Sequence, residues 1–150
     1  MKTLYTDASF SPQGNASNGE NIVRGKIAVV WDGGHKIDKV AIGRVDGLKQ
    51  YNNVLELTAL ARAIELACED EVKPDSLKIY TDSRTAMIWA SNGRIKDGVR
   101  TLAHENALEY LKKVRHIFGG IVTFNFIGRE GNPAGKLLEG ELEKERSYTV

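Results

Sequence analysis

Two short stretches decide the fold of this chain: LYTDAS at residues 4–9 and IYTDSR at residues 79–84. Each runs from an apolar residue through Tyr-Thr into an aspartate, Asp7 or Asp82, where the pattern predicts that a β-strand ends. The sequences that follow differ, because residues 7–15 contain Pro and Gly and are typical of a loop, whereas residues 83–91 are typical of a helix. The two stretches are therefore not an internal repeat, and the aspartates need another explanation.

The composition is that of one globular domain spanning residues 1–150, with 41% hydrophobic and 27% charged residues. The net charge of +1 gives no overall attraction to nucleic acid or to a membrane. The single cysteine, Cys68, excludes an internal disulfide and agrees with a reducing cytosol. No apolar run is long enough for a membrane span, and the N-terminal residues lack the apolar core of a signal peptide. We therefore expect a cytoplasmic enzyme or binding module.

The order of apolar patterns predicts an α/β domain with a mixed sheet. Strand-like runs joined by turn residues come first, and later strands alternate with amphipathic helices, so antiparallel strands should precede parallel ones. The strongest helix begins with NNVLELTAL at residues 52–60. Strands are expected at residues 2–8, 22–32, 38–45, 76–82 and 121–127, and helices at residues 52–71, 83–91, 99–118 and from residue 134 onward.

Three carboxylates stand at notable positions, and each has an ordinary structural explanation. Asp7 suits a turn after the first strand. Asp82 or Ser83 suits the N-cap of the helix that follows. Glu56 is the third residue after Asn53, an N-x-x-E pattern related to the capping box. Taken singly, these residues indicate no function.

Taken together, the three carboxylates predict a metal site. Ligands of open α/β sheets gather beyond the carboxyl ends of the strands, so Asp7 and Asp82 on neighbouring strands should lie close together. The crossover helix should bring Glu56 near them. Three such carboxylates repel one another and raise one another's pKa values, and a divalent cation relieves this repulsion. A ligand set made only of oxygen atoms favours Mg²⁺ or Mn²⁺ over zinc.

Four segments in this order and spacing resemble the type 1 ribonuclease H family over nearly the whole chain. They are YTDAS, NNVLELTAL, IYTDSR and IGREGNPAGKLLE, the last at residues 127–139. The specific parts are the NN-x-x-E pattern that opens the first helix and the TDS after the fourth strand. The resemblance implies a ribonuclease H-like fold, with a five-stranded mixed sheet whose first three strands are antiparallel and which is flanked by helices.

The resemblance also implies an activity: hydrolysis of the RNA strand of RNA–DNA hybrids by two Mg²⁺ (or Mn²⁺) ions. Asp7, Glu56 and Asp82 would be the catalytic metal ligands, and the products would carry a 5′-phosphate and a 3′-hydroxyl. No membrane or obligate protein partner is implied. The resemblance places five further residues at or near the substrate: Asn52, Asn53, Ser83, Arg129 and Asn132. Helix capping by the asparagines and an ordinary solvated Arg129 remain alternatives.

The sequence departs from the family pattern at Gly135, where the resemblance implies an Asp as fourth metal ligand. The segment reads AGKLLE at residues 134–139, and glycine inside a helix costs about 1 kcal/mol relative to alanine. Glu139 lies one helical turn later on the same face and is the nearest substitute ligand, with Glu130 a weaker candidate; a plain surface charge is the alternative. The alternative function is a weakly active or non-catalytic nucleic-acid-binding or interaction module.

A modest basic segment follows the second expected helix. A solvated helix face and a weak, salt-dependent contact for nucleic acid are equally good interpretations of it. Residues 94–116 contain Arg94, Lys96, Arg100, Lys112, Lys113 and Arg115, against Asp97, Glu105 and Glu109.

Overall fold

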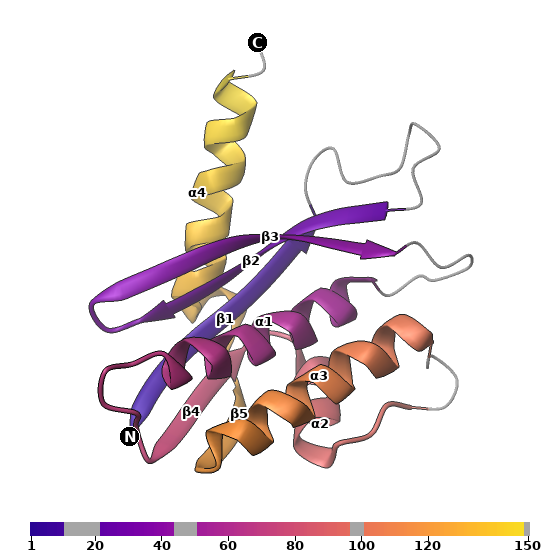
Figure 1. Cartoon of the computed structure of the whole chain (residues 1–150). Helices are drawn as coiled ribbons and strands as arrows, with labels where there is room; N and C mark the ends of the chain where they lie inside the picture. Colours follow the sequence, from indigo (N-terminus) through magenta and orange to yellow (C-terminus); the bar gives the residue numbers. More distant parts are fainter. Residues whose placement is uncertain (11–21, 44–50, 97–100, 149–150) are drawn as a thin grey trace.

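The computed structural model describes residues 1–10, 22–43, 51–96 and 101–148, and Figure 1 shows the course of the chain. Of the loop expected at residues 7–15, residues 11–15 lie outside the described residues, as do Asp97 and Arg100 of the basic segment. The elements are β1 (Lys2–Phe10), β2 (Ile22–Trp31), β3 (Gly34–Gly43), α1 (Tyr51–Cys68), β4 (Ser76–Thr81), α2 (Arg84–Asn92), α3 (Leu102–Phe118), β5 (Ile121–Phe126), a short 3-10 turn (Arg129–Gly131) and α4 (Pro133–Tyr148).

The five strands form one mixed sheet in the order β3-β2-β1-β4-β5. β2 pairs antiparallel with both β1 and β3, whereas β4 pairs parallel with both β1 and β5. This arrangement confirms the predicted fold class. It also makes β1 and β4 parallel neighbours, so their carboxyl ends meet at the same edge of the sheet.

Expected boundaries of β3 and α1 differ from those in the structure. β3 begins at Gly34 instead of residue 38, because the hairpin turn needs only Asp32 and Gly33. Gly33 has a φ of +93°, which glycine adopts without the penalty that other residues incur. α1 spans Tyr51–Cys68 instead of 52–71, so it starts one residue earlier and ends three residues sooner than expected.

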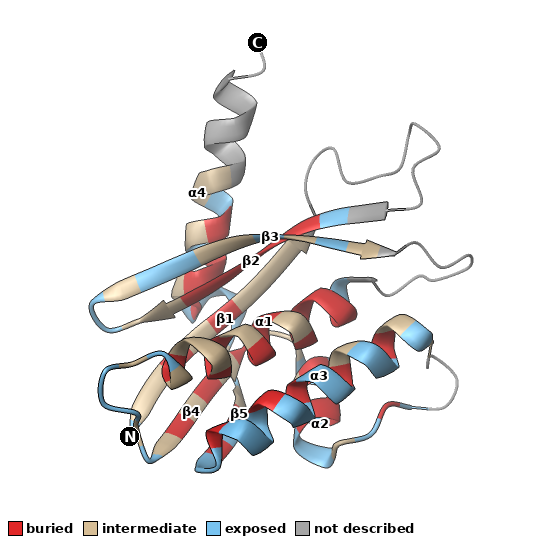
Figure 2. Cartoon of the chain, in the orientation of Figure 1, coloured by how far each residue is buried: buried red, intermediate tan, exposed pale blue. Residues whose placement is uncertain are grey.

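The helices cover the two faces of the sheet unequally. α1, α2 and α3 lie on one face over the main hydrophobic core, to which α1 contributes Leu57, Leu60 and Ile64. α4 crosses the other face over β1 and β2, where a small cluster joins Ala134 and Leu138 to Ala28 of β2. In Figure 2 helix α1 is coloured almost entirely buried or intermediate, whereas exposed residues recur along α3.

Candidate active site

Asp7 and Asp82 stand side by side at the carboxyl edge of the β1–β4 pair. The last parallel pair of these strands is Thr6 with Thr81, and each aspartate directly follows its threonine. The expectation that Asp7 ends its strand was wrong, because β1 continues to Phe10 and Asp7 pairs with Ala28 of β2. β1 therefore continues alongside β2 beyond its last pair with β4, and the two aspartates lie where β4 ends.

The Tyr-Thr-Asp motif has a structural role at each of its positions, which the sequence analysis missed. The Tyr5 and Tyr80 rings stack across the strands, with their centroids 5.2 Å apart. The Thr6 hydroxyl donates to the Tyr80 carbonyl at 2.9 Å, and Thr81 Oγ1 accepts from the Ser83 N–H at 3.1 Å. Both threonines are fully buried. The matched motifs therefore fix the register that brings the two aspartates together.

Glu56 reaches the aspartates from α1 on the helical side of the sheet. It is 5% exposed, its Oε1 accepts from the Ala8 N–H at 3.2 Å, and its Oε2 accepts from the Thr81 hydroxyl at 3.4 Å. One carboxylate oxygen each from Asp7, Glu56 and Asp82 lies within 4.8 Å of the others, a group able to hold a metal ion. The structure thus brings together the three carboxylates that the sequence analysis selected.

Burial and crowding raise the pKa values of two of these carboxyl groups. Burial is the largest cause for Asp7, whose pKa rises from 3.8 to about 6, and repulsion from Asp82 adds to the rise. Burial likewise raises the pKa of Glu56 well above its ordinary 4.5, with repulsion from Asp7 next in size. The Ala8 N–H opposes both shifts without cancelling them. The protein therefore holds negative charge here at a cost that a divalent cation would remove.

The available ligand atoms suit a hard divalent cation. The group contains carboxylate oxygens from Asp7, Glu56 and Asp82 and no softer ligand. Mg²⁺ and Mn²⁺ both prefer such ligands, and Mg²⁺ is commonly held by few carboxylates with water completing its shell. The geometry supports metal binding and does not by itself select the ion.

Asn132 attaches α4 to the carboxylate edge. Its Oδ1 accepts from the Ala134 N–H at 3.1 Å, which is the N-cap expected before Pro133. Its Nδ2 donates to the Thr6 carbonyl at 2.9 Å and to Asp82 Oδ2 at 3.4 Å. Because Asn132 is fully buried, the structure places it behind Asp82 as a support for the site.

Gly135 lies directly against the two aspartates. A Cβ atom at this position would be 3.1 Å from Asp7 Oδ2 and 3.9 Å from Asp82 Oδ2. α4 therefore brings position 135 to the carboxylates, and the glycine presents no side chain there. Glu139, one turn later, is exposed, and so is Glu130. Neither belongs to the metal-capable group, which consists of Asp7, Glu56 and Asp82.

The asparagine pair and Ser83 lie where α1 meets the start of α2. The expected capping box was wrong, because α1 begins at Tyr51 and Asn53 is inside its first turn. Asn53 is buried, and its Oδ1 accepts from the Ser83 hydroxyl at 3.4 Å. Ser83 is the N-cap of α2, with its Oγ accepting from the Ala86 N–H at 3.1 Å. Asn52 is exposed on the same turn of α1, and Arg129 is exposed in the 3-10 turn before α4.

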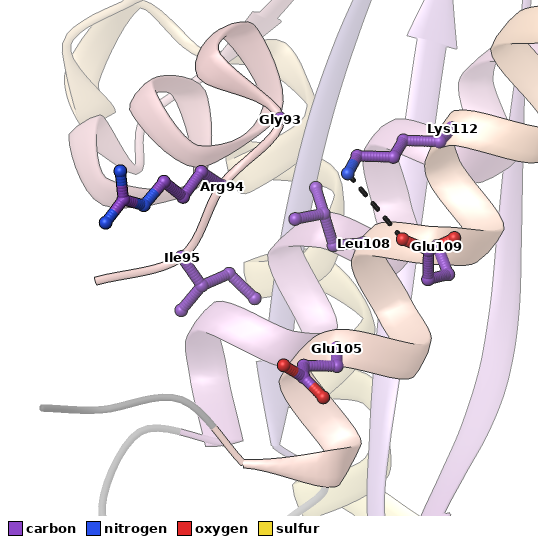
Figure 3. Close-up of a pocket in the computed structure, with 7 residues that line it drawn as sticks. All are labelled: Gly93, Arg94, Ile95, Glu105, Leu108, Glu109 and Lys112. Atoms are coloured by element: carbon purple, nitrogen blue, oxygen red, sulfur yellow. Dashed lines mark ion pairs between the residues drawn. The ribbon is translucent and has the colours of Figure 1, made fainter. Parts of the chain in front are cut away.

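A separate hollow of about 280 Å³ lies between the segment after α2 and helix α3 (Figure 3). Its lining combines two cations, Arg94 and Lys112, with two anions, Glu105 and Glu109. Lys112 Nζ lies 3.6 Å from Glu109 Oε1. In the described part of the basic segment five cations stand against two anions, so it keeps an excess of positive charge despite this ion pair.

No protein-family model matches the sequence, and no curated protein matches it. The structure of RNase H1 from the halophilic archaeon Halobacterium salinarum NRC-1 is similar with a TM-score of 0.64 at 19% identity, over 96% of this chain and 98% of that chain. The N-terminal RNase H domain of a Mycobacterium tuberculosis protein, fused to maltose binding protein, is similar with a TM-score of 0.64 at 18% identity, over 100% of both chains.

A third similar structure is LC11-RNase H1, solved in complex with an RNA/DNA hybrid. Its TM-score is 0.65 at 20% identity, over 97% of this chain and 99% of that chain. At such identities the likeness establishes the fold: this chain has the ribonuclease H-like fold that its motifs predicted. None of the helices in the described ranges combines the length and apolar character that a membrane crossing requires.

Proposed function

We propose that this chain, acting as one domain over residues 1–150, is a metal-dependent endonuclease that hydrolyses the RNA strand of RNA–DNA hybrids. The observation that carries the proposal is the convergence of Asp7, Glu56 and Asp82 within 4.8 Å at the edge of a ribonuclease H-like sheet. One protein of similar fold was solved with an RNA/DNA hybrid bound, which supports the choice of substrate. The proposal includes a cytoplasmic location. It requires neither a protein partner nor a membrane.

In this proposal Asp7, Glu56 and Asp82 hold Mg²⁺ or Mn²⁺ at the scissile phosphate. Bound divalent ions would polarise the phosphate and lower the pKa of the attacking water, and two ions are expected once substrate is present. The protein itself contributes fixed negative charge and position instead of a nucleophile. The Ala8 N–H and the Thr81 hydroxyl keep Glu56 aimed at the aspartates, and Asn132 keeps Asp82 in place. The products carry a 5′-phosphate and a 3′-hydroxyl.

Recognition of RNA falls to the residues around the start of α1. Asn52 is exposed there, and Asn53 and Ser83 hold each other at the adjoining start of α2. Amide and hydroxyl groups at this position can bond the 2′-hydroxyls of the minor groove, which distinguish RNA from DNA. Arg129 is exposed in the 3-10 turn before α4 and is proposed to contact the substrate near the cleaved bond.

The proposal is tested by incubating a labelled RNA–DNA hybrid with the protein in Mg²⁺ or Mn²⁺ and resolving the products on a gel. Wild type should cleave the RNA strand and leave duplex DNA intact. Asp7→Asn should keep a cooperative fold and lose activity, because it removes a charge at the centre of the group. Asp75→Asn is the matched control, since Asp75 is exposed just before β4, away from the carboxyl edge. Activity that persists in Asp7→Asn would refute the assignment.

A second candidate is a binding module that does not cleave, and Gly135 is the observation that favours it. The position closest to both aspartates carries no side chain, so the group has three carboxylates. In this case the hybrid would bind, and Asp7→Asn would bind it more tightly because a repulsive charge is gone. Binding without cleavage in both Mg²⁺ and Mn²⁺ would favour the module over the enzyme.

A further inference from the structure

Arg84 and Phe126 form a stacked pair at the rim of the candidate active site. Arg84 is the first residue of α2, two positions after Asp82, and Phe126 is the last residue of β5. The Arg84 guanidinium carbon lies 4.1 Å from the centre of the Phe126 ring. Phe126 pairs with Thr81, the residue before Asp82, so the ring stands next to the carboxylate edge. Both residues are exposed.

Several cations among the described residues are engaged by oxygen acceptors, whereas no such acceptor is found there for Arg84. Arg62 Nε lies 2.8 Å from Asp38 Oδ2, Lys2 Nζ lies 2.7 Å from Asp70 Oδ2, and Arg115 donates to the Val122 carbonyl at 3.1 Å. Within the described residues, stacking on Phe126 is the interaction that Arg84 makes. Stacking uses the flat face of a guanidinium and leaves its N–H donors at the edges available to a ligand.

We propose that Arg84, held flat on Phe126, binds a backbone phosphate of the nucleic acid next to the scissile one. This inference rests on the proposed function and adds a substrate contact to it. A guanidinium matches the two oxygens of a phosphate with parallel hydrogen bonds. Asp82 and Arg84 are two positions apart, so their Cα atoms are separated by at most about 7 Å. A phosphate bound by Arg84 would therefore neighbour the phosphate at the carboxylates.

The charge balance of the protein explains why a cationic contact at this position would help to bind nucleic acid. The net charge of +1 provides no overall attraction for a polyanion, and three carboxylates at the site repel it. A cation fixed beside Asp82 offsets this repulsion where the strand must approach most closely. Phe126 explains how the cation is fixed: an unsupported exposed arginine would lose more side-chain entropy on binding than one already stacked on a ring.

The experiment measures binding of a fluorescent RNA–DNA hybrid in Ca²⁺ over a series of salt concentrations. Arg84→Ala should weaken binding about tenfold and lower the slope of log affinity against log salt by about one, the signature of one lost phosphate contact. Arg84→Lys and Phe126→Leu keep the charge, so both should keep the slope and weaken binding less. Lys36→Ala is the matched control, because this exposed lysine lies on β3, the edge strand of the sheet opposite β5, and it should match wild type.

Each outcome separates this inference from the proposed function. If Arg84→Ala binds the hybrid as tightly as wild type and with the same salt slope, the inference is overturned and the nuclease proposal stands. A changed melting temperature or metal response with an unchanged slope would mean that Arg84 acts on the carboxylates, which also overturns it. If wild type binds no hybrid, the proposed function fails. The same salt series on single-stranded RNA and duplex DNA then decides whether Arg84 contacts phosphate, and no binding to either overturns the inference as well.

Discussion

α1 and α4 approach the same pair of aspartates from opposite faces of the sheet, and they contribute differently. α1 belongs to the large core and delivers the buried Glu56, whose oxygens are held by the Ala8 N–H and the Thr81 hydroxyl. α4 rests on a small cluster and delivers Gly135, whose Cβ would be 3.1 Å from Asp7 Oδ2. α1 therefore contributes a carboxylate to the site, whereas α4 lies against the site and contributes no side chain at position 135.

This difference shows that the placement of a helix beside the aspartates does not depend on whether the helix carries a metal-binding side chain there. The N-cap at Asn132 ties α4 to Thr6 and Asp82 whether or not position 135 has a side chain. α4 is thus held against the aspartates, and the glycine at position 135 contributes no side chain there. Changes at Glu56 should therefore remove function, and changes at Gly135 should add to it.

The largest effect is expected from Glu56→Gln. Removing the charge that α1 brings should reduce cleavage by on the order of 10³-fold, comparable to the loss of one fixed charge-stabilising group in other active sites. The metal-free protein should become more stable near neutral pH, because burial raises the pKa of Glu56 and makes its ionised form costly. Kinetics and urea unfolding measure the two effects.

The control is Glu69→Gln, an exposed acid just after α1 that lies 3.8 Å from Arg62. It should leave cleavage unchanged. If Glu56→Gln cleaves like wild type, α1 does not supply a metal ligand and the contrast with α4 disappears.

The next effect concerns pH and the metal-free protein. In the unfolded chain Asp7 loses its proton near 3.8, whereas in the folded protein it does so at about 6. Between these values the folded state binds more protons, so its stability falls as pH rises from about 4 through about 6. The loss from Asp7 is up to about 3 kcal/mol, at about 1.4 kcal/mol per pKa unit. Urea unfolding in EDTA at several pH values measures it.

Asp7→Asn should flatten this pH dependence, since the titrating group is removed. Mg²⁺ should also flatten it in wild type, because a bound cation stabilises the ionised carboxylates that are costly without it. Stability that rises from pH 4 to pH 7 in EDTA would contradict the assigned cause, which is burial joined with repulsion from Asp82.

Much of this site could be predicted from the sequence because topology determines it. Parallel pairing of β1 with β4 brings Asp7 and Asp82 to one edge, and the crossover helix brings Glu56 beside them. Where Asp7 lies within its strand could not be predicted, because the end of β1 depends on its pairing with β2. The true start of α1 was missed because a capping pattern is a local signal that packing can override.

The roles of Thr6, Thr81 and the Arg84–Phe126 pair were also missed. Each depends on contacts between residues far apart in the chain, and a sequence pattern records only local spacing. The repeated threonine before each aspartate was the one available signal. The Thr6 hydroxyl makes a cross-strand hydrogen bond to the Tyr80 carbonyl, and Thr81 bonds the Ser83 N–H and Glu56.

A smaller effect is expected when α4 is given the ligand it lacks. Gly135→Asp should raise cleavage in Mg²⁺ about tenfold, which corresponds to about 1.4 kcal/mol of barrier. The added Cβ would be 3.1 Å from Asp7 Oδ2, so the Asp7 carboxylate must shift by a few tenths of an ångström. Without metal the fourth charge adds repulsion, so the melting temperature should rise more steeply with Mg²⁺ than in wild type.

The matched control is Gly140→Asp, later in α4, where no atom lies within 4 Å of an added Cβ. It adds the same charge without reaching the site and should change neither cleavage nor the metal response. Wild type should turn over faster in Mn²⁺ than in Mg²⁺, and Gly135→Asp should narrow this gap. An unchanged metal response in Gly135→Asp would show that position 135 does not act on the ions.

The smallest effect is expected from Glu139→Gln, which asks whether α4 supplies a ligand from its second turn instead. Glu139 is exposed and outside the metal-capable group, so cleavage should change by less than about twofold, as for surface charges that make no fixed contact. A large loss in wild type would make Glu139 a substitute ligand that turns inward only with metal or substrate. In that case the loss should vanish in the Gly135→Asp background, because an Asp one turn earlier would already occupy the position beside Asp7. Measuring the double variant against both single variants decides between these outcomes, since only a shared ligand role makes the two changes non-additive.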